Sequence, residues 1–120
     1  MDYEYTPSII GLKITSISSM AKSIAIIRKY NPVSMSEIKS SIESGKYVLE
    51  CSILSHPGVR QIRKCYDELK KIGNEVELYE CDELISREII SNIIASHRQT
   101  EREVRAQVDA EVAAEGGDEE

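Results

Sequence analysis

The chain has 120 residues and a formal net charge of −6, from 15 basic and 21 acidic side chains. Residues 99–120 carry 2 of the basic and 8 of the acidic side chains, which leaves 13 of each in residues 1–98. A neutral body with an acidic end lacks the basic surface that phosphates require, so we do not expect nucleic-acid binding. The length suits one domain with a tail.

The cysteines are Cys51, Cys65 and Cys81, an odd number without a CxxC pair. With no secretory signal at the N-terminus, this usage indicates a reducing, cytoplasmic location. The cysteines and the two histidines fit no zinc spacing, so we expect buried free thiols and no metal. No apolar run approaches the roughly 20 residues that span a bilayer, so no membrane segment is expected.

The first elements follow a polar lead-in, residues 1–8. Residues 9–15 alternate between apolar and polar side chains, which predicts a strand. A helix over about residues 19–30 follows, with Ser18 or Ser19 as its N-cap. Asn31-Pro32 ends this helix, because a residue before proline is forced out of the helical region.

The second helix begins with a capping box. Ser34 is the expected N-cap and Glu37 the third helical residue. Gly45 supplies the left-handed position that closes this helix. Residues 46–54 then read as a second strand.

A third helix begins near Pro57, with Ser55 or His56 as its cap, and ends at Gly73. Residues 74–81 alternate and predict a half-exposed third strand. The order of elements is therefore β-α-α-β-α-β, and this unit fills a domain over residues 9–81.

Asp82 is the expected cap of an additional C-terminal helix over residues 82–112, and residues 113–120 are expected to be a disordered acidic tail. The helix carries more apolar surface than a free helix should expose. It must pack on its own domain, a second copy or another partner. For a homodimer, the candidate dimer helix is marked by three isoleucines at intervals of four: Ile85, Ile89 and Ile93.

Three segments resemble a known family. They are residues 24–30, residues 33–44 with Glu37-Ile38-Lys39 at their core, and residues 69–78, where a helix runs through glycine into a strand. Together they are similar to the C-terminal domain of the bacterial large-subunit ribosomal stalk protein (L-seven/L-twelve). The resemblance implies an α+β, two-layer sandwich in which three helices pack on a three-stranded, mainly antiparallel sheet. The Clp protease adaptor domain has a similar fold.

In the stalk family the first two helices recruit translation factors. The resemblance therefore implies a protein-binding face with an apolar centre and a basic rim, an arrangement suited to an acidic partner. In the alternative interpretation, the apolar residues belong to the core and the charges form a solvated rim. The candidate protein-binding residues are Lys22, Ile24, Ile27, Arg28, Lys29 and Lys39.

No phosphate-binding glycine loop, nucleophile elbow or HExxH motif is present, so we expect neither an enzyme nor a bound cofactor. The leading hypothesis is a non-enzymatic protein-interaction module that binds a translation-related or other cytoplasmic protein through its first two helices. The alternative is an acidic inhibitor, immunity-type or adaptor protein that acts through its C-terminal helix and tail.

Overall fold

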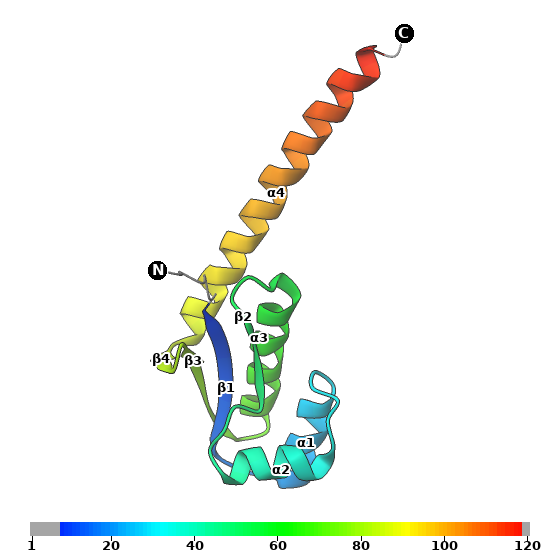
Figure 1. Cartoon of the computed structure of the whole chain (residues 1–120). Coiled ribbons are helices and arrows are strands. Elements are labelled where there is room, and N and C mark those ends of the chain that lie inside the picture. The colour runs from blue at the N-terminus through cyan, green and yellow to red at the C-terminus, as the bar shows by residue number, and fades with distance from the viewer. Residues whose placement is uncertain (1–7, 119–120) are drawn as a thin grey trace, which may run out of the picture.

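The computed structural model describes residues 8–118, with side chains through residue 108. Most of the expected lead-in, residues 1–7, lies outside this range. The elements in chain order are β1 (Ile9–Ser16), α1 (Met20–Arg28), α2 (Met35–Glu43), β2 (Leu49–Ser52), α3 (His56–Lys71), β3 (Glu75–Glu80), β4 (Glu83–Ile85) and α4 (Arg87–Asp118). One antiparallel sheet has the strand order β2-β1-β3-β4 (Figure 1).

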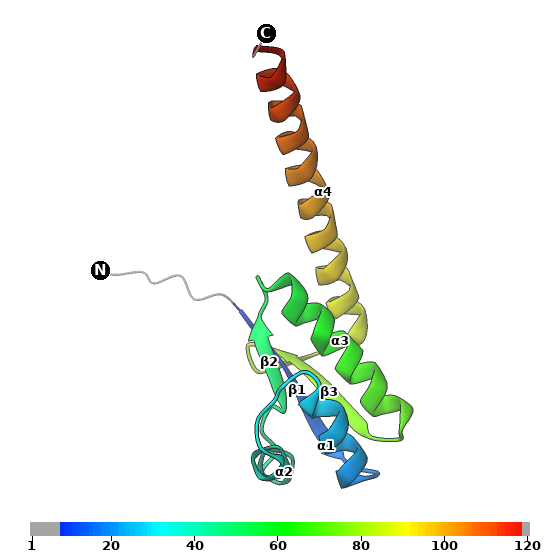
Figure 2. The ribbon, with the colours of Figure 1, turned by 90° about the vertical axis from the view of Figure 1, so that its right-hand side faces the viewer.

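The helices lie on one side of the sheet. Figure 2 shows α1, α3 and the first turns of α4 beside one face, while α2 lies near the lower end of the sheet. In the described part of the chain, no helix covers the opposite face (Figures 1 and 2). This arrangement confirms the predicted α+β fold with helices packed on an antiparallel sheet.

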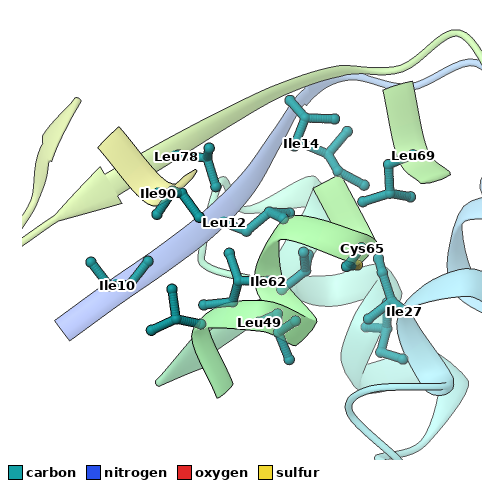
Figure 3. Packing of buried hydrophobic residues seen from close by; sticks show 14 of the residues in the cluster. Ile10, Leu12, Ile14, Ile27, Leu49, Ile62, Cys65, Leu69, Leu78 and Ile90 are labelled. Carbon is teal, nitrogen blue, oxygen red and sulfur yellow. The ribbon is translucent and has the colours of Figure 1, made fainter. Parts of the chain in front are cut away.

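The core forms between that covered face and the helices. On β1, Ile10 and Leu12 are fully buried because alternate residues of a strand point to the same face. They meet apolar side chains from α1 and α3, including Ile27 and Ile62 (Figure 3). The first turns of α4 add Ile90 to the same cluster. Branched aliphatic residues therefore fill the core, as the composition predicts.

Local sequence signals set most helix ends. Ser34 and Ser55 accept backbone hydrogen bonds at the starts of α2 and α3, which confirms the expected caps. Gly45 and Gly73 adopt φ of +70° and +97° after α2 and α3, as predicted for C′ glycines. The second strand is shorter than expected, since residues 46–48 precede β2 rather than forming part of it.

The sheet has four strands, so the expected count of three is corrected. Glu80 pairs with Glu83 across a two-residue loop, Cys81-Asp82, in which both residues have positive φ. Such a loop reverses the chain with the twist that a hairpin needs. Asp82 is therefore a turn residue and not the cap of α4. The helix begins at Arg87, after Ser86, whose hydroxyl accepts from the Ile89 amide.

The helix α4 extends beyond the rest of the domain (Figure 1). Its first part packs on α3 and the sheet, and the rest projects away from the body (Figures 1 and 2). It continues through Asp118, beyond the predicted end near residue 112 and into the segment predicted to be disordered. Residues 106–115 are rich in Ala and Glu, which favour the helical state. Residues 119–120 lie outside the described range.

Candidate protein-interaction site

The predicted α1–α2 face lacks its apolar centre. Ile24 is 5% exposed and Ile27 is fully buried, because the apolar stripe of α1 faces the core. Lys29 forms an ion pair with Glu68 on α3. The pKa of the Glu68 carboxyl is lowered, mainly by the hydrogen bond that Lys29 donates to it. The charged rim predicted from the sequence is exposed: Lys22, Arg28, Lys29 and Lys39.

Met35 is an exposed apolar residue at the start of α2. Its side chain is 55% exposed and lies one helical turn before Lys39 on α2. Met35 therefore gives the basic helix pair a small apolar contact point of its own.

The three isoleucines of the predicted dimer helix do not share one free helix face. Ile85 lies in β4 and is half-buried, since the helix begins only at Arg87. Ile93 packs against the core, and Ile89 is 39% exposed. The core-facing side of α4 is instead formed by Ile90 and Ile94, which are 0% and 1% exposed.

Polar contacts between α3 and α4 supplement this apolar anchor. The Arg87 guanidinium donates to both Asp67 carboxylate oxygens, at 2.7 and 2.8 Å. These bonds lower the pKa of the Asp67 carboxyl. Further along, Arg63 of α3 donates to the Ser91 hydroxyl at 3.3 Å. The base of α4 is therefore fixed to α3 by both packing and directed hydrogen bonds.

A stacked histidine pair marks the point where α4 leaves the domain. The rings of His56 and His97 lie 3.9 Å apart and nearly parallel, at 10°. His56 Nδ1 is 2.5 Å from a Glu101 carboxylate oxygen, and that oxygen is also 3.5 Å from the Arg60 guanidinium. His97 Nδ1 is buried without a hydrogen-bond partner.

The histidine pair is also electrostatically distinctive. Burial lowers the pKa of His97, and the neighbouring His56 lowers it further. The hydrogen bond with His56 lowers the pKa of the Glu101 carboxyl. The sequence places both histidines on predicted helices, but it contains no signal that brings the two rings together.

Beyond this junction, α4 exposes apolar side chains. We call residues 102–118 the α4 overhang. Val104 and Val108, 54% and 48% exposed, lie one turn apart in it. They line a shallow groove of about 410 Å³ together with His56 and Glu101 of the junction. Apolar side chains in a groove next to charged groups are typical of a docking surface.

A basic stripe runs along α4 beside the groove. It consists of Arg98, Arg102 and Arg105, whose spacing of four and three residues places them on one side of a helix. Among the side chains that the structure describes, none of these arginines forms an ion pair with a carboxylate. All three arginine side chains are exposed.

The uncovered face of the sheet carries a lysine between two tyrosines. The Lys13 ammonium lies 5.0 Å from the centre of the Tyr47 ring and 4.7 Å from that of Tyr79. The Tyr47 hydroxyl donates to Asp82 at 2.5 Å. Burial and this hydrogen bond raise the pKa of Tyr47 to about 12. Since these groups satisfy one another, we interpret the cluster as structural.

The cysteines are free, but they differ in exposure. Cys65 is buried and Cys51 is half-buried, and burial raises the pKa of their thiols to about 12 and about 11. Cys81 is exposed in the β3–β4 turn, which corrects the expectation that all three thiols are buried. Among the side chains that the structure describes, those of residues 8–108, no group of three or more His, Cys, Asp or Glu is placed to hold a metal ion.

Comparison with protein-family models, curated proteins and solved structures finds no match. None of the helices in the described part of the chain is both long enough and apolar enough to cross a membrane.

Proposed function

We propose that this chain is a non-enzymatic protein-interaction module of the cytoplasm and that the α4 overhang is its main docking element. The observation that carries the proposal is a change of environment along one helix face. Ile90 and Ile94 bury this face against the domain, while Val104 and Val108 expose its continuation to solvent. A helix that extends its core-facing side into water is suited to a second apolar surface.

The size of this surface implies a modest affinity. Fully burying a valine contributes about 1.5 kcal/mol or more, and Val104 and Val108 are already about half-covered. Apolar burial at these two positions therefore provides on the order of 2 kcal/mol. Charge complementarity along the arginine stripe must supply both specificity and further affinity.

Capture from native lysate tests the proposal. The bait is the full chain, compared with a Val104→Glu/Val108→Glu variant. A Leu84→Glu variant is the matched control, because Leu84 is 62% exposed but lies in β4. We expect wild type and control to retain a protein that the double variant loses, and that protein should bind purified wild type in calorimetry. Equal recovery by all three baits would refute the docking role of the overhang.

The α1–α2 face is a second candidate, favoured by the exposure of Met35 beside Lys39. In this alternative, a translation-related or other acidic partner binds the two helices, as the family resemblance implies. Arg28→Glu combined with Lys39→Glu should then abolish capture of that partner while leaving the thermal midpoint unchanged, because both side chains are exposed. Unchanged recovery with this variant would exclude the α1–α2 face.

A further inference from the structure

We propose that the stacked rings of His56 and His97 form a pH-sensitive latch that fixes the direction of the α4 overhang. While the His97 ring is neutral, the latch holds α4 against the start of α3. Protonation of His97 releases this contact, and the overhang then tilts about the apolar anchor at the base of α4. The inference goes beyond the proposed function, because it concerns how the docking element is oriented and not which protein it binds.

The latch lies where α4 loses its apolar support. Ile94 is the last described residue of α4 in the hydrophobic core, and Val104 further along is 54% exposed. Between these positions, His97 and Glu101 connect α4 with the first turns of α3. Gln107 lies about 20 Å along the helix from Ile94, so a small tilt at the anchor is amplified in the overhang. The direction of the overhang therefore depends on these contacts.

The geometry of the stack requires a neutral His97. Its ring lies 3.9 Å from the His56 ring and is nearly parallel to it, at 10°. Its Nδ1 atom is buried and has no hydrogen-bond partner among the described residues. A proton on this nitrogen would be a buried donor without an acceptor, and it would place a positive charge face to face with a second imidazole. Protonation of His97 therefore opposes the stack.

The groups around His97 provide one carboxylate for several basic side chains. His56 and the Arg60 guanidinium face the ring from α3, and the Glu101 carboxylate faces it from α4. Both α3 groups already contact Glu101: one of its carboxylate oxygens lies 2.5 Å from His56 Nδ1 and 3.5 Å from the Arg60 guanidinium. The segment before α3 contributes a hydrogen bond with the Ile53 backbone. A proton on His97 would therefore share a single negative charge with two other basic groups.

These surroundings make the latched ring a weaker base than a released one. Burial and then His56 lower the pKa of His97 below its ordinary 6.5, although the Ile53 hydrogen bond and Glu101 oppose this shift. A ring released into water regains its ordinary pKa and binds the proton more tightly. Acidification therefore favours the released state, and the latch closes again as the pH rises above about 6.5.

The coupling of one proton sets the size of the effect. For a pKa that is well below 6.5 in the latched state, the ratio of latched to released molecules falls by up to about tenfold between pH 7.5 and 5.5. Glu101 does not contribute to this change, because its hydrogen bond with His56 lowers the pKa of the carboxyl and keeps it ionised throughout the interval.

A pair of spin labels on the full chain tests the latch. The labels are attached to Ala21→Cys on α1 and Gln107→Cys on the overhang, two exposed positions, in a Cys81→Ser background. Cys51 and Cys65 stay unlabelled at neutral pH, because burial raises the pKa of their thiols to about 11 and about 12.

We expect one narrow distribution of distances at pH 7.5 and a second population at pH 5.5, with the ratio of the two changed by up to about tenfold. His97→Leu is the matched control, because it places an apolar side chain at the same site without a titratable group. Its distribution should be the same at both pH values. Wild-type distances that do not change with pH, or an equal change in His97→Leu, would overturn the proposal.

Nuclear magnetic resonance of the wild-type chain provides a second measurement that needs no variant. The Cε1 proton of His97 reports the protonation of the ring, and its titration midpoint should lie below pH 6.5. Hydrogen exchange of the amides of residues 98–108 should accelerate with the same midpoint, while the amides of β1 remain protected. A midpoint at or above 6.5, or exchange that does not follow the titration, would contradict the latch. None of these measurements requires a captured protein, so their failure would not affect the proposed docking role.

Discussion

Position 11 on β1 must be a glycine because the Tyr47 ring, far away in the sequence, packs against it. A Cβ atom at this position would lie 2.6 Å from the Tyr47 ring, well inside van der Waals contact. We therefore expect Gly11→Ala to lower the free energy of unfolding by about 1–3 kcal/mol, as overpacking usually does. Urea unfolding measures this change. In a Tyr47→Ala background the same substitution should have a much smaller effect, and an equal penalty there would show that the ring is not the cause.

The pKa of His97 predicts a pH dependence of stability. The folded protein holds the pKa of His97 below its ordinary 6.5, so the folded state binds the proton less tightly than the unfolded chain does. Stability should therefore fall as the pH decreases below about 6.5. The charged and titratable groups that face this ring are His56, Glu101 and Arg60, and a His97→Leu variant retains all three residues.

Chemical denaturation of wild type and His97→Leu at pH 7.5 and 5.5 measures this effect. Wild type should lose more stability than the variant over this interval. The lowered pKa of the Glu101 carboxyl stabilises the fold at both pH values, because that contribution is lost only below about pH 4.5. An identical pH dependence in the two proteins would show that His97 does not titrate as described.

At the residue scale, the helix caps could be predicted from the sequence. The contacts between residues far apart in the sequence could not. The caps Ser34 and Ser55 and the left-handed Gly45 follow from neighbours within a few positions. The contact of Gly11 with Tyr47 and the stack of His56 on His97 depend on how whole elements pack. No spacing rule connects residues that far apart.

Among the elements, the β3–β4 hairpin is where local signals mislead. Asp82 before an apolar run is typical of a helix start, but two residues in the left-handed region turn the chain into β4 instead. The usual hairpin signal is Asn-Gly or Asp-Gly, and Cys81-Asp82 lacks the glycine. Pairing with β3 at Leu78↔Ile85 and Tyr79↔Leu84 outweighs the local preference for helix.

The turn itself yields a prediction. Cys81 has φ of +49°, a conformation that Asn adopts more readily than other residues with a side chain. Cys81→Asn should therefore raise the free energy of unfolding by about 0.5–1 kcal/mol, measured by urea denaturation. Cys81→Val, which introduces a β-branched side chain at the same exposed position, should lower it. If both substitutions shift stability in the same direction, the turn conformation does not control the outcome.

For the whole molecule, the net charge of −6 divides between a neutral domain and an acidic helix end. The radius of gyration is 18.8 Å, against about 14 Å for a compact chain of this length. The difference reflects the overhang, which projects from the body in Figure 1. The sequence predicts a final helix and its acidic end. It does not predict where the domain stops covering that helix, because this depends on where α3 begins in space.

Hydrogen–deuterium exchange of the full chain, alone and with the protein that it captures, tests the central claim, that the α4 overhang is a docking surface. An uncovered helix end opens frequently, so the amides of residues 102–118 should exchange rapidly in dilute protein. We predict that their exchange slows at least several-fold when the captured protein is added, while the amides of β1 are unaffected. In Val104→Glu/Val108→Glu the slowing should disappear. Rapid exchange of the wild-type overhang in the presence of that protein would contradict docking through α4.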